Sequence, residues 1–170
     1  SAEYVTGAIA DIEIGGRNYI VLSTLLNSRY IDQSTGEVKN ATTHYATDFI
    51  EVSEGQRYII HSKGVNGFHN LRVVYYDNER NYINGSVRLN ESNHVLITIP
   101  SGAMFVRLSA GYEASANRGS PPEQWKMEKG NKAADWSPAP EDVQVEIDSV
   151  YQYASSEISQ LSGRINLKAD

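Results

Sequence analysis

The chain has 170 residues, no cysteine and a formal net charge of −6, with 40% hydrophobic and 21% charged residues. Its length allows one ordinary domain plus an appendage, and its mean hydropathy of −0.45 predicts a well-solvated surface. The negative charge opposes contact with a phosphate backbone, so we expect no nucleic acid partner. Without cysteine there is no disulfide framework and no thiolate metal site. No apolar run in the sequence is long enough to span a bilayer, so we expect no membrane partner.

The first residues have the apolar spacing of a short helix. Apolar side chains recur three or four positions apart and therefore share one stripe: Ala2, Val5, Ile9 and Ile12. Gly15 and Gly16 then end the helical pattern. We predict a helical connector over residues 1–14, too short to be stable unless it packs on something.

Residues 15–140 have the pattern of short strands, and we predict one domain over this range. The predicted strands are rich in Val, Ile, Tyr or Phe and are bounded by Gly, Asn, Ser or Pro. They span residues 18–23, 48–52, 57–62, 71–76, 86–89, 95–99, 105–110 and 124–128. The turns at 52–58 and 100–102 look like hairpin connections. Strands without intervening helices predict a mainly β fold, an antiparallel β-sandwich of the jelly-roll kind.

Two long segments with few apolar residues are predicted to be loops. Residues 24–47 carry Tyr30, His44 and Tyr45, and residues 111–123 carry Tyr112, Glu113 and Arg118. Loops of this length inside a compact domain are usually binding segments or disordered. We favour binding.

The last 30 residues, 141–170, are predicted to form one helix with an apolar seam. Pro138 and Pro140 precede it, and Glu141 and Asp142 supply an acidic first turn. The seam contains Val143, Ile147, Val150, Ala154, Ile158, Leu161 and Ile165. Its 11-residue repeat corresponds to about 3.67 residues per turn, which is typical of a straight or slightly right-handed supercoil. The helix either folds back on the sandwich or joins other copies in a coiled coil; we favour a homotrimer.

Known catalytic and metal-binding motifs are absent from the sequence. There is no GxSxG, HExxH, Walker A or GxGxxG pattern, and His44, His61, His69 and His94 are scattered. Residues 77–79 resemble the start of a calcium loop, but the Gly and Glu that an EF-hand needs later are missing, so a plain turn is the better interpretation. We therefore predict a non-catalytic protein with no cofactor. A structural calcium ion held by loop carbonyls stays open.

Aromatic and arginine side chains supply the candidate binding residues. The chain has 11 Tyr, whose flat faces and polar tips suit sugar rings, although many will be packing residues. Strand alternation places Arg72 and Tyr76 on the face opposite Leu71, Val73 and Tyr75. The candidate saccharide-binding residues are Tyr45, Arg72, Tyr76, Arg107, Tyr112 and Lys126.

The same alternation sets Phe105 and Arg107 opposite Val106 and Leu108. Arg107 could donate a planar fork to a hydroxyl pair or a phosphate, or pair with a carboxylate in the sheet. In the last strand, Trp125 and Met127 are assigned to the core, which leaves Lys126 and Glu128 on the other face. We then expect Gly130 to turn the chain and Trp136 to pack the outgoing segment against the sandwich.

Three stretches together carry a family resemblance. They are GGRNY at residues 15–19, IPSGAMFVRLSAGY at 99–112 and WKMEKGNKAADWSPAPED at 125–142. They resemble the carbohydrate-binding-type module found in tail and baseplate proteins of phages and prophages that infect Gram-positive bacteria. The resemblance implies a galactose-binding-like jelly roll in the virion, often trimeric, that adheres to host cell-wall polysaccharide and contacts other tail proteins. It transfers no binding residue, because ligand positions vary among such modules.

Two alternatives to saccharide binding stay open. The first is a structural tail spacer or protein-interaction module that binds no sugar. The second is an enzyme, such as a depolymerase or an accessory domain of one, because the separation of two carboxylates that decides such chemistry is spatial.

Overall fold

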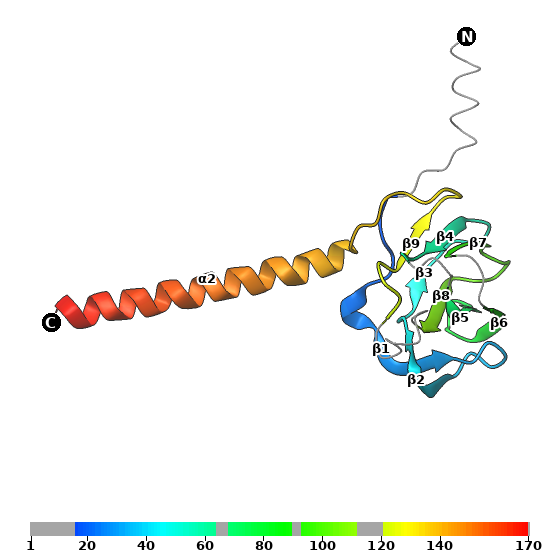
Figure 1. Ribbon diagram of the computed structural model, residues 1–170, viewed down its shortest axis with the longest axis horizontal. Coiled ribbons are helices and arrows are strands. Elements are labelled where there is room, and N and C mark those ends of the chain that lie inside the picture. The colour runs from blue at the N-terminus through cyan, green and yellow to red at the C-terminus, as the bar shows by residue number, and fades with distance from the viewer. Residues whose placement is uncertain (1–15, 64–67, 90–92, 112–120, 170) are drawn as a thin grey trace, which may run out of the picture. The chain divides into compact units, whose positions relative to one another are not determined.

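The computed structural model describes residues 16–63, 68–89, 93–111 and 121–169 (Figure 1). The chain divides into two compact units, 1–139 and 140–170, which we describe separately. The predicted N-terminal helix over residues 1–14 lies outside the described residues. The elements of the first unit are η1 (Leu22–Thr24), β1 (Leu26–Ile31), β2 (Val38–Ala46), β3 (Ile50–Glu51), β4 (Arg57–His61), β5 (His69–Tyr76), β6 (Tyr82–Arg88), β7 (His94–Thr98), β8 (Phe105–Gly111) and β9 (Lys126–Lys129).

Within the described residues, the strands form two antiparallel sheets. The larger, six-stranded sheet has the order β1-β2-β8-β5-β6, and β3 also pairs with β8. The smaller, three-stranded sheet has the order β7-β4-β9, and Figure 1 shows these strands next to one another. The protein is therefore mainly β with antiparallel sheets, as the sequence predicts. The jelly-roll connectivity stays a prediction.

One hydrophobic core receives side chains from both sheets, an arrangement that fits a sandwich. The larger sheet contributes Leu71, Val73 and Tyr75 from β5 and Val106 and Leu108 from β8. The smaller sheet contributes Tyr58, Ile60, Val95, Ile97 and Met127, and Trp125 is fully buried beside them. The alternation predicted for β5, β8 and the strand that contains Met127 is confirmed, because their apolar residues two apart point to the same core.

The outer face of the larger sheet is covered by a second, smaller cluster. Val74 and Tyr76 point away from the main core, as predicted, yet both are buried. The side chains that cover them are Ile31, Ala46, Phe49 and Phe105. The predicted loop over residues 24–47 is wrong, because it contains β1 and β2, which supply two of these covering residues.

Several connections also differ from the sequence prediction. Residues 18–23 do not form a strand, although the amide of Tyr19 donates to the carbonyl of Met127 at 2.8 Å. The turns at 52–58 and 100–102 are not hairpins. Each joins a strand of one sheet to a strand of the other, since β3 and β8 belong to the larger sheet while β4 and β7 belong to the smaller. The chain thus passes between sheets at tight turns.

Asn18 fastens the N-terminal segment to β9 and to the outgoing chain. Its amide donates to the carbonyls of Trp125 at 3.0 Å and Ser137 at 3.2 Å. Its side-chain oxygen accepts from the amides of Ile20 at 2.9 Å and Met127 at 3.1 Å. Asn18 is fully buried, so these four hydrogen bonds satisfy its whole side chain away from water.

The segment after β9 folds over the outer face of the smaller sheet. Gly130 turns the chain with a positive φ of 112°, which confirms its predicted role. The carboxylate of Glu128 then accepts from the amide of Ala134 at 2.8 Å, and the ammonium of Lys126 donates to the carbonyl of Asp135 at 2.8 Å. Trp136 is 37% exposed, so polar contacts and the buried Ala139, more than this ring, hold the segment.

The second unit is a helix, α2 (Pro140–Ala169), with Glu141 and Asp142 in its first turn. The predicted helix is confirmed. Its seam residues Val143, Ile147, Val150, Ile158, Leu161 and Ile165 are exposed. No helix within the described residues is long and apolar enough to cross a membrane. The coiled coil stays a prediction.

Candidate functional site

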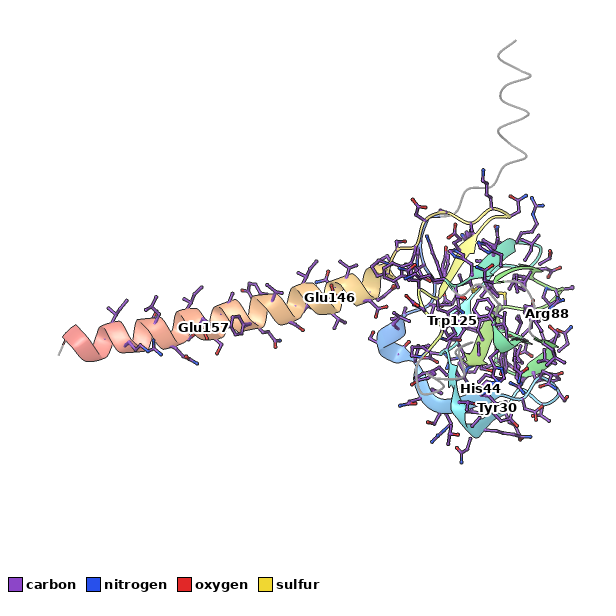
Figure 2. The ribbon with its side chains drawn as sticks, in the orientation of Figure 1. Tyr30, His44, Arg88, Trp125, Glu146 and Glu157 are labelled. Atoms are coloured by element: carbon purple, nitrogen blue, oxygen red, sulfur yellow. The ribbon has the colours of Figure 1, made fainter. Side chains whose placement is uncertain are left out.

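Arg72 on β5 lies at the centre of a polar and aromatic cluster on the outer face of the larger sheet. Its guanidinium stacks over the ring of Tyr30 in β1, 4.5 Å from the ring centroid. Its Nε donates to Oε1 of Gln33 at 3.2 Å, and its Nη1 donates to Nε2 of His44 in β2 at 3.2 Å. Figure 2 shows Tyr30 and His44 close together, and their ring centroids are 6.2 Å apart.

His44 is held in a neutral form by these contacts. Arginine cannot accept a hydrogen bond, so Nε2 of His44 must be the acceptor. The proton then lies on Nδ1, which donates to Oγ1 of Thr43 at 2.9 Å. Burial, together with the charges of Arg72 and His69, lowers the pKa of His44 to about 4. His44 therefore orients Arg72 at neutral pH without adding a second charge.

Three polar groups of the cluster lack a hydrogen-bond partner among the described residues. They are Nη2 of Arg72, the hydroxyl of Tyr30 and the ring nitrogens of His69, whose ring centroid is 5.6 Å from that of His44. Arg72 is half-buried, so part of its side chain is open to solvent. We name the set Tyr30, Gln33, His44, His69 and Arg72 the Arg72 surface.

A closely packed loop holds Gln33 against this surface. The carbonyl of Gln33 accepts from the hydroxyl of Tyr82 on β6 at 2.8 Å. A Cβ on Gly85 would lie 2.6 Å from the same carbonyl oxygen, so only glycine allows this approach. Farther along the loop, the carbonyl of Gly36 accepts from the hydroxyl of Tyr76 at 2.7 Å. Tyr76 thus anchors the loop and does not face solvent.

Of the six residues predicted to bind saccharide, the structure places one, Arg72, in this surface. Tyr76 and Arg107 share its sheet face but are buried, and Arg107 stacks over Phe49 at 4.5 Å while its Nε donates to the carbonyl of Thr47. Tyr45 packs against the main core. Tyr112 lies outside the described residues.

Lys126 is also buried, at 1% exposure, on the other sheet. Its ammonium lies 3.0 Å from Oε2 of Glu128, which also accepts from Nε2 of His61 at 2.9 Å. The sequence places Lys126 on the correct face of its strand, but the following segment covers that face. Lys126 is therefore not part of the Arg72 surface.

Sequence reasoning left four members of the Arg72 surface out of the candidate set. Tyr30 and His44 had a usable signal, since both lie in the segment predicted to be a binding loop. Gln33 lies in the same segment but was not singled out there, and His69 lies outside it. Gln33 reaches Arg72 from the connection between β1 and β2, and that approach depends on strand pairing that local patterns do not reveal. His69 lies on β5 itself, where the register of the strand shifts between His69 and Arg72, and simple alternation does not predict such a shift.

The acidic and histidine side chains of the described residues are spread over the fold. Within the described ranges, no group of three His, Asp or Glu side chains could hold a metal ion. Residues 77–81 form the predicted turn: Oδ1 of Asp77 accepts from the amides of Glu79 and Asn81, each at 2.9 Å. These hydrogen bonds lower the pKa of Asp77.

Comparison with known proteins points to phage tails. No protein-family model and no solved structure matches the chain. The chain is 26% identical over 151 residues to a tail fiber protein of Enterococcus phage phiEF24C. That match includes 88% of this chain but only 8% of the tail fiber protein. The similarity favours a tail module with a structural or adhesive role.

Proposed function

We propose that this chain is a non-catalytic module of a phage tail that binds a saccharide of the host cell wall and so helps the tail adhere. The module is a galactose-binding-like jelly roll that sits in the virion at the tail tip or baseplate, next to other tail proteins. The similarity to a tail fiber protein supports the tail assignment. The family resemblance of residues 15–19, 99–112 and 125–142 supports the saccharide.

The Arg72 surface is the observation that carries the binding proposal. The hydroxyl of Tyr30 and the unpartnered groups of Arg72 and His69 can bond sugar hydroxyls, beside the stacked pair of Arg72 and Tyr30. Arg72 is preorganised by Gln33 and His44, so little side-chain entropy is lost on binding.

Binding of the chain to purified Gram-positive cell walls tests the proposal, with enterococcal walls first because the similar tail fiber belongs to an Enterococcus phage. We expect Arg72→Gln to weaken binding by at least about tenfold, because it removes charge-assisted hydrogen bonds. Arg29→Gln is the matched control, since Arg29 is exposed on β1 and bonds the carbonyl of Ser28. Equal affinity of Arg72→Gln and the parent would place the binding site elsewhere.

We also propose that α2 assembles the protein into a homotrimer through its exposed apolar seam. The seam needs a partner, because its apolar side chains are exposed while the opposite side of the helix is mostly polar apart from Val145. Three copies would make later binding events intramolecular and raise avidity by about 10²–10⁴. Weak single sites would then suffice for adhesion.

Changing Ile147 and Ile158 together to Asp is expected to give a monomer in sedimentation equilibrium, because charges would enter the apolar seam. Ser149→Asp with Ser156→Asp is the control, since these positions lie on the opposite side of the helix. It should leave the trimer intact. A parent chain that sediments as a monomer would remove the trimer from the proposal.

The alternative is a structural spacer or a protein-interaction module that binds no sugar. Its support is the long exposed helix and the small share of the tail fiber that the chain matches. Absence of binding to any cell-wall polysaccharide at about millimolar concentration, with trimerisation kept, would favour it. Release of reducing ends from those polysaccharides would instead establish an enzyme.

A further inference from the structure

We propose that the Arg72 surface recognises an anionic group, a phosphate or a carboxylate, carried by the saccharide. This inference rests on the proposed function and deepens it, because it selects charged wall polymers over neutral ones. It concerns the same five residues and needs no further site.

The charge of Arg72 is uncompensated within the described residues. Its three hydrogen-bond acceptors are all neutral: Oε1 of Gln33, Nε2 of His44 and the carbonyl of Asn70. No carboxylate of the described residues forms an ion pair with it. Asp32 is the acid whose charge acts on Arg72, but its carboxylate already accepts from Lys39 at 2.6 Å.

Arg72 is also partly withdrawn from water, and burial lowers its pKa from the ordinary value. Arginine nevertheless keeps its charge, because its pKa lies far above neutral pH. A partly buried cation beside neutral groups gains more from an incoming anion than a fully solvated one does, since the local dielectric is lower. An anionic ligand would therefore supply the missing charge.

The geometry leaves one edge of the guanidinium for that anion. Nε and Nη1 are used within the protein, and the flat face covers the Tyr30 ring. Nη2 remains, with two N–H groups directed along the guanidinium plane. Charge-assisted hydrogen bonds from such a group to phosphate or carboxylate oxygens are about twice as strong as neutral ones. The hydroxyl of Tyr30 and the ring of His69 are further partners for the same anion.

The experiment is an NMR titration of the full chain with three probes: inorganic phosphate, glucuronate and glucose. We expect phosphate or glucuronate to shift the Nε–H signal of Arg72 and the ring signals of His69 at concentrations about tenfold lower than glucose does. Binding should weaken as salt rises from about 50 mM to about 500 mM, because ions screen the attraction. The tighter of the two anions indicates whether the ligand is a phosphodiester polymer or a uronic acid.

Three variants define the role of Arg72. Arg72→Gln should weaken anion binding by at least about tenfold, and Arg72→Lys, which keeps the charge but loses the planar fork, should fall between it and the parent. Arg80→Gln is the control for overall charge, since Arg80 stacks on Phe49 and Phe105 on the same face and forms no ion pair with the described residues. It should change binding by less than about twofold. Anion binding that survives Arg72→Gln overturns the inference.

The inference and the proposed function fail differently. Binding of neutral wall polysaccharide by a chain that ignores phosphate and glucuronate would overturn the inference and leave the adhesive role standing. The opposite result is a chain that binds either anion through Arg72 and binds no cell wall. That result would support the anion site and remove the adhesive role.

Discussion

Replacing Asn18 by alanine is expected to lower the free energy of unfolding of the first unit by about 3–5 kcal/mol. The substitution removes four hydrogen bonds at once and leaves the amides of Ile20 and Met127 without their acceptor. Each buried group left unsatisfied costs about 1–3 kcal/mol, and the small alanine side chain also leaves a cavity. Urea unfolding at one fixed protein concentration, followed by the fluorescence of the buried Trp125, measures the difference.

Asn84→Ala is the matched control for this variant. Asn84 is an exposed asparagine on β6, so its replacement should change stability by no more than about 0.5 kcal/mol. A similar loss of unfolding free energy in both variants would mean that the buried position of Asn18 does not cause the destabilisation. An Asn18→Ala protein as stable as the parent would show that water replaces the four hydrogen bonds.

The position of Asn18 explains why the motif stretches of the chain go together. Asn18 belongs to the stretch GGRNY, and its partners Trp125, Met127 and Ser137 belong to WKMEKGNKAADWSPAPED. These hydrogen bonds thus join the segment that precedes the first strand to the segment that contains and follows β9. Asn18 contacts backbone atoms of these partners, so the pairing of the two stretches supports the fold and assigns no binding residue.

The sequence predicted those strands in which apolar side chains alternate. β5 and β8 each place apolar residues on one face at a spacing of two, and their core faces are as expected. β1 and β2 were missed because LNSRYI and VKNATTHYA are mostly polar, so they show no such period. Hairpins and sheet-to-sheet turns use the same residue types, so the turns at 52–58 and 100–102 could not be told apart.

The only part of the candidate site that the sequence predicted is what strand parity shows, namely which residues of one strand share a face. Parity placed Arg72 and Tyr76 on one face of their strand, and Arg107 with Phe105 on one face of another. The observed pairing of β5 with β8 is what brings all three to the same sheet face. Parity cannot show that the β1–β2 hairpin, which comes much earlier in the chain, covers the middle of that face. Burial of Tyr76 and exposure of the Arg72 edge therefore had to come from the three-dimensional structure.

Glu128→Gln is expected to destabilise the first unit by about 3–5 kcal/mol, because it leaves the ammonium of Lys126 buried without its counter-charge. Glu128 is fully buried and contacts Lys126, His61 and the amide of Ala134. Glu123→Gln is the control. It breaks an exposed pair with Lys63, 2.9 Å long, which should contribute no more than about 1 kcal/mol. Equal losses in the two variants would contradict the importance of burial.

The same carboxylate predicts a dependence of stability on pH. Burial alone would raise the pKa of Glu128, but hydrogen bonds from His61, Ala134 and Lys126 outweigh it, and the pKa is lowered from 4.5. A carboxyl whose folded-state pKa is lowered stabilises the fold above the unfolded pKa and loses that contribution as pH falls through the folded value. The parent should therefore lose stability below about pH 4.5 more steeply than Glu128→Gln does.

Replacing Lys126 by Met and Glu128 by Leu together tests whether the buried ion pair adds to the free energy of unfolding or only disfavours alternative folded conformations. Buried ion pairs often contribute little net stability, because desolvation offsets their attraction. We expect the double variant to recover at least half of the loss seen in Glu128→Gln in urea unfolding, although the amide of Ala134 then lacks its acceptor. A double variant no more stable than Glu128→Gln would show that the polar contacts to residues 134 and 135, and not charge pairing, hold the outgoing chain on the sandwich.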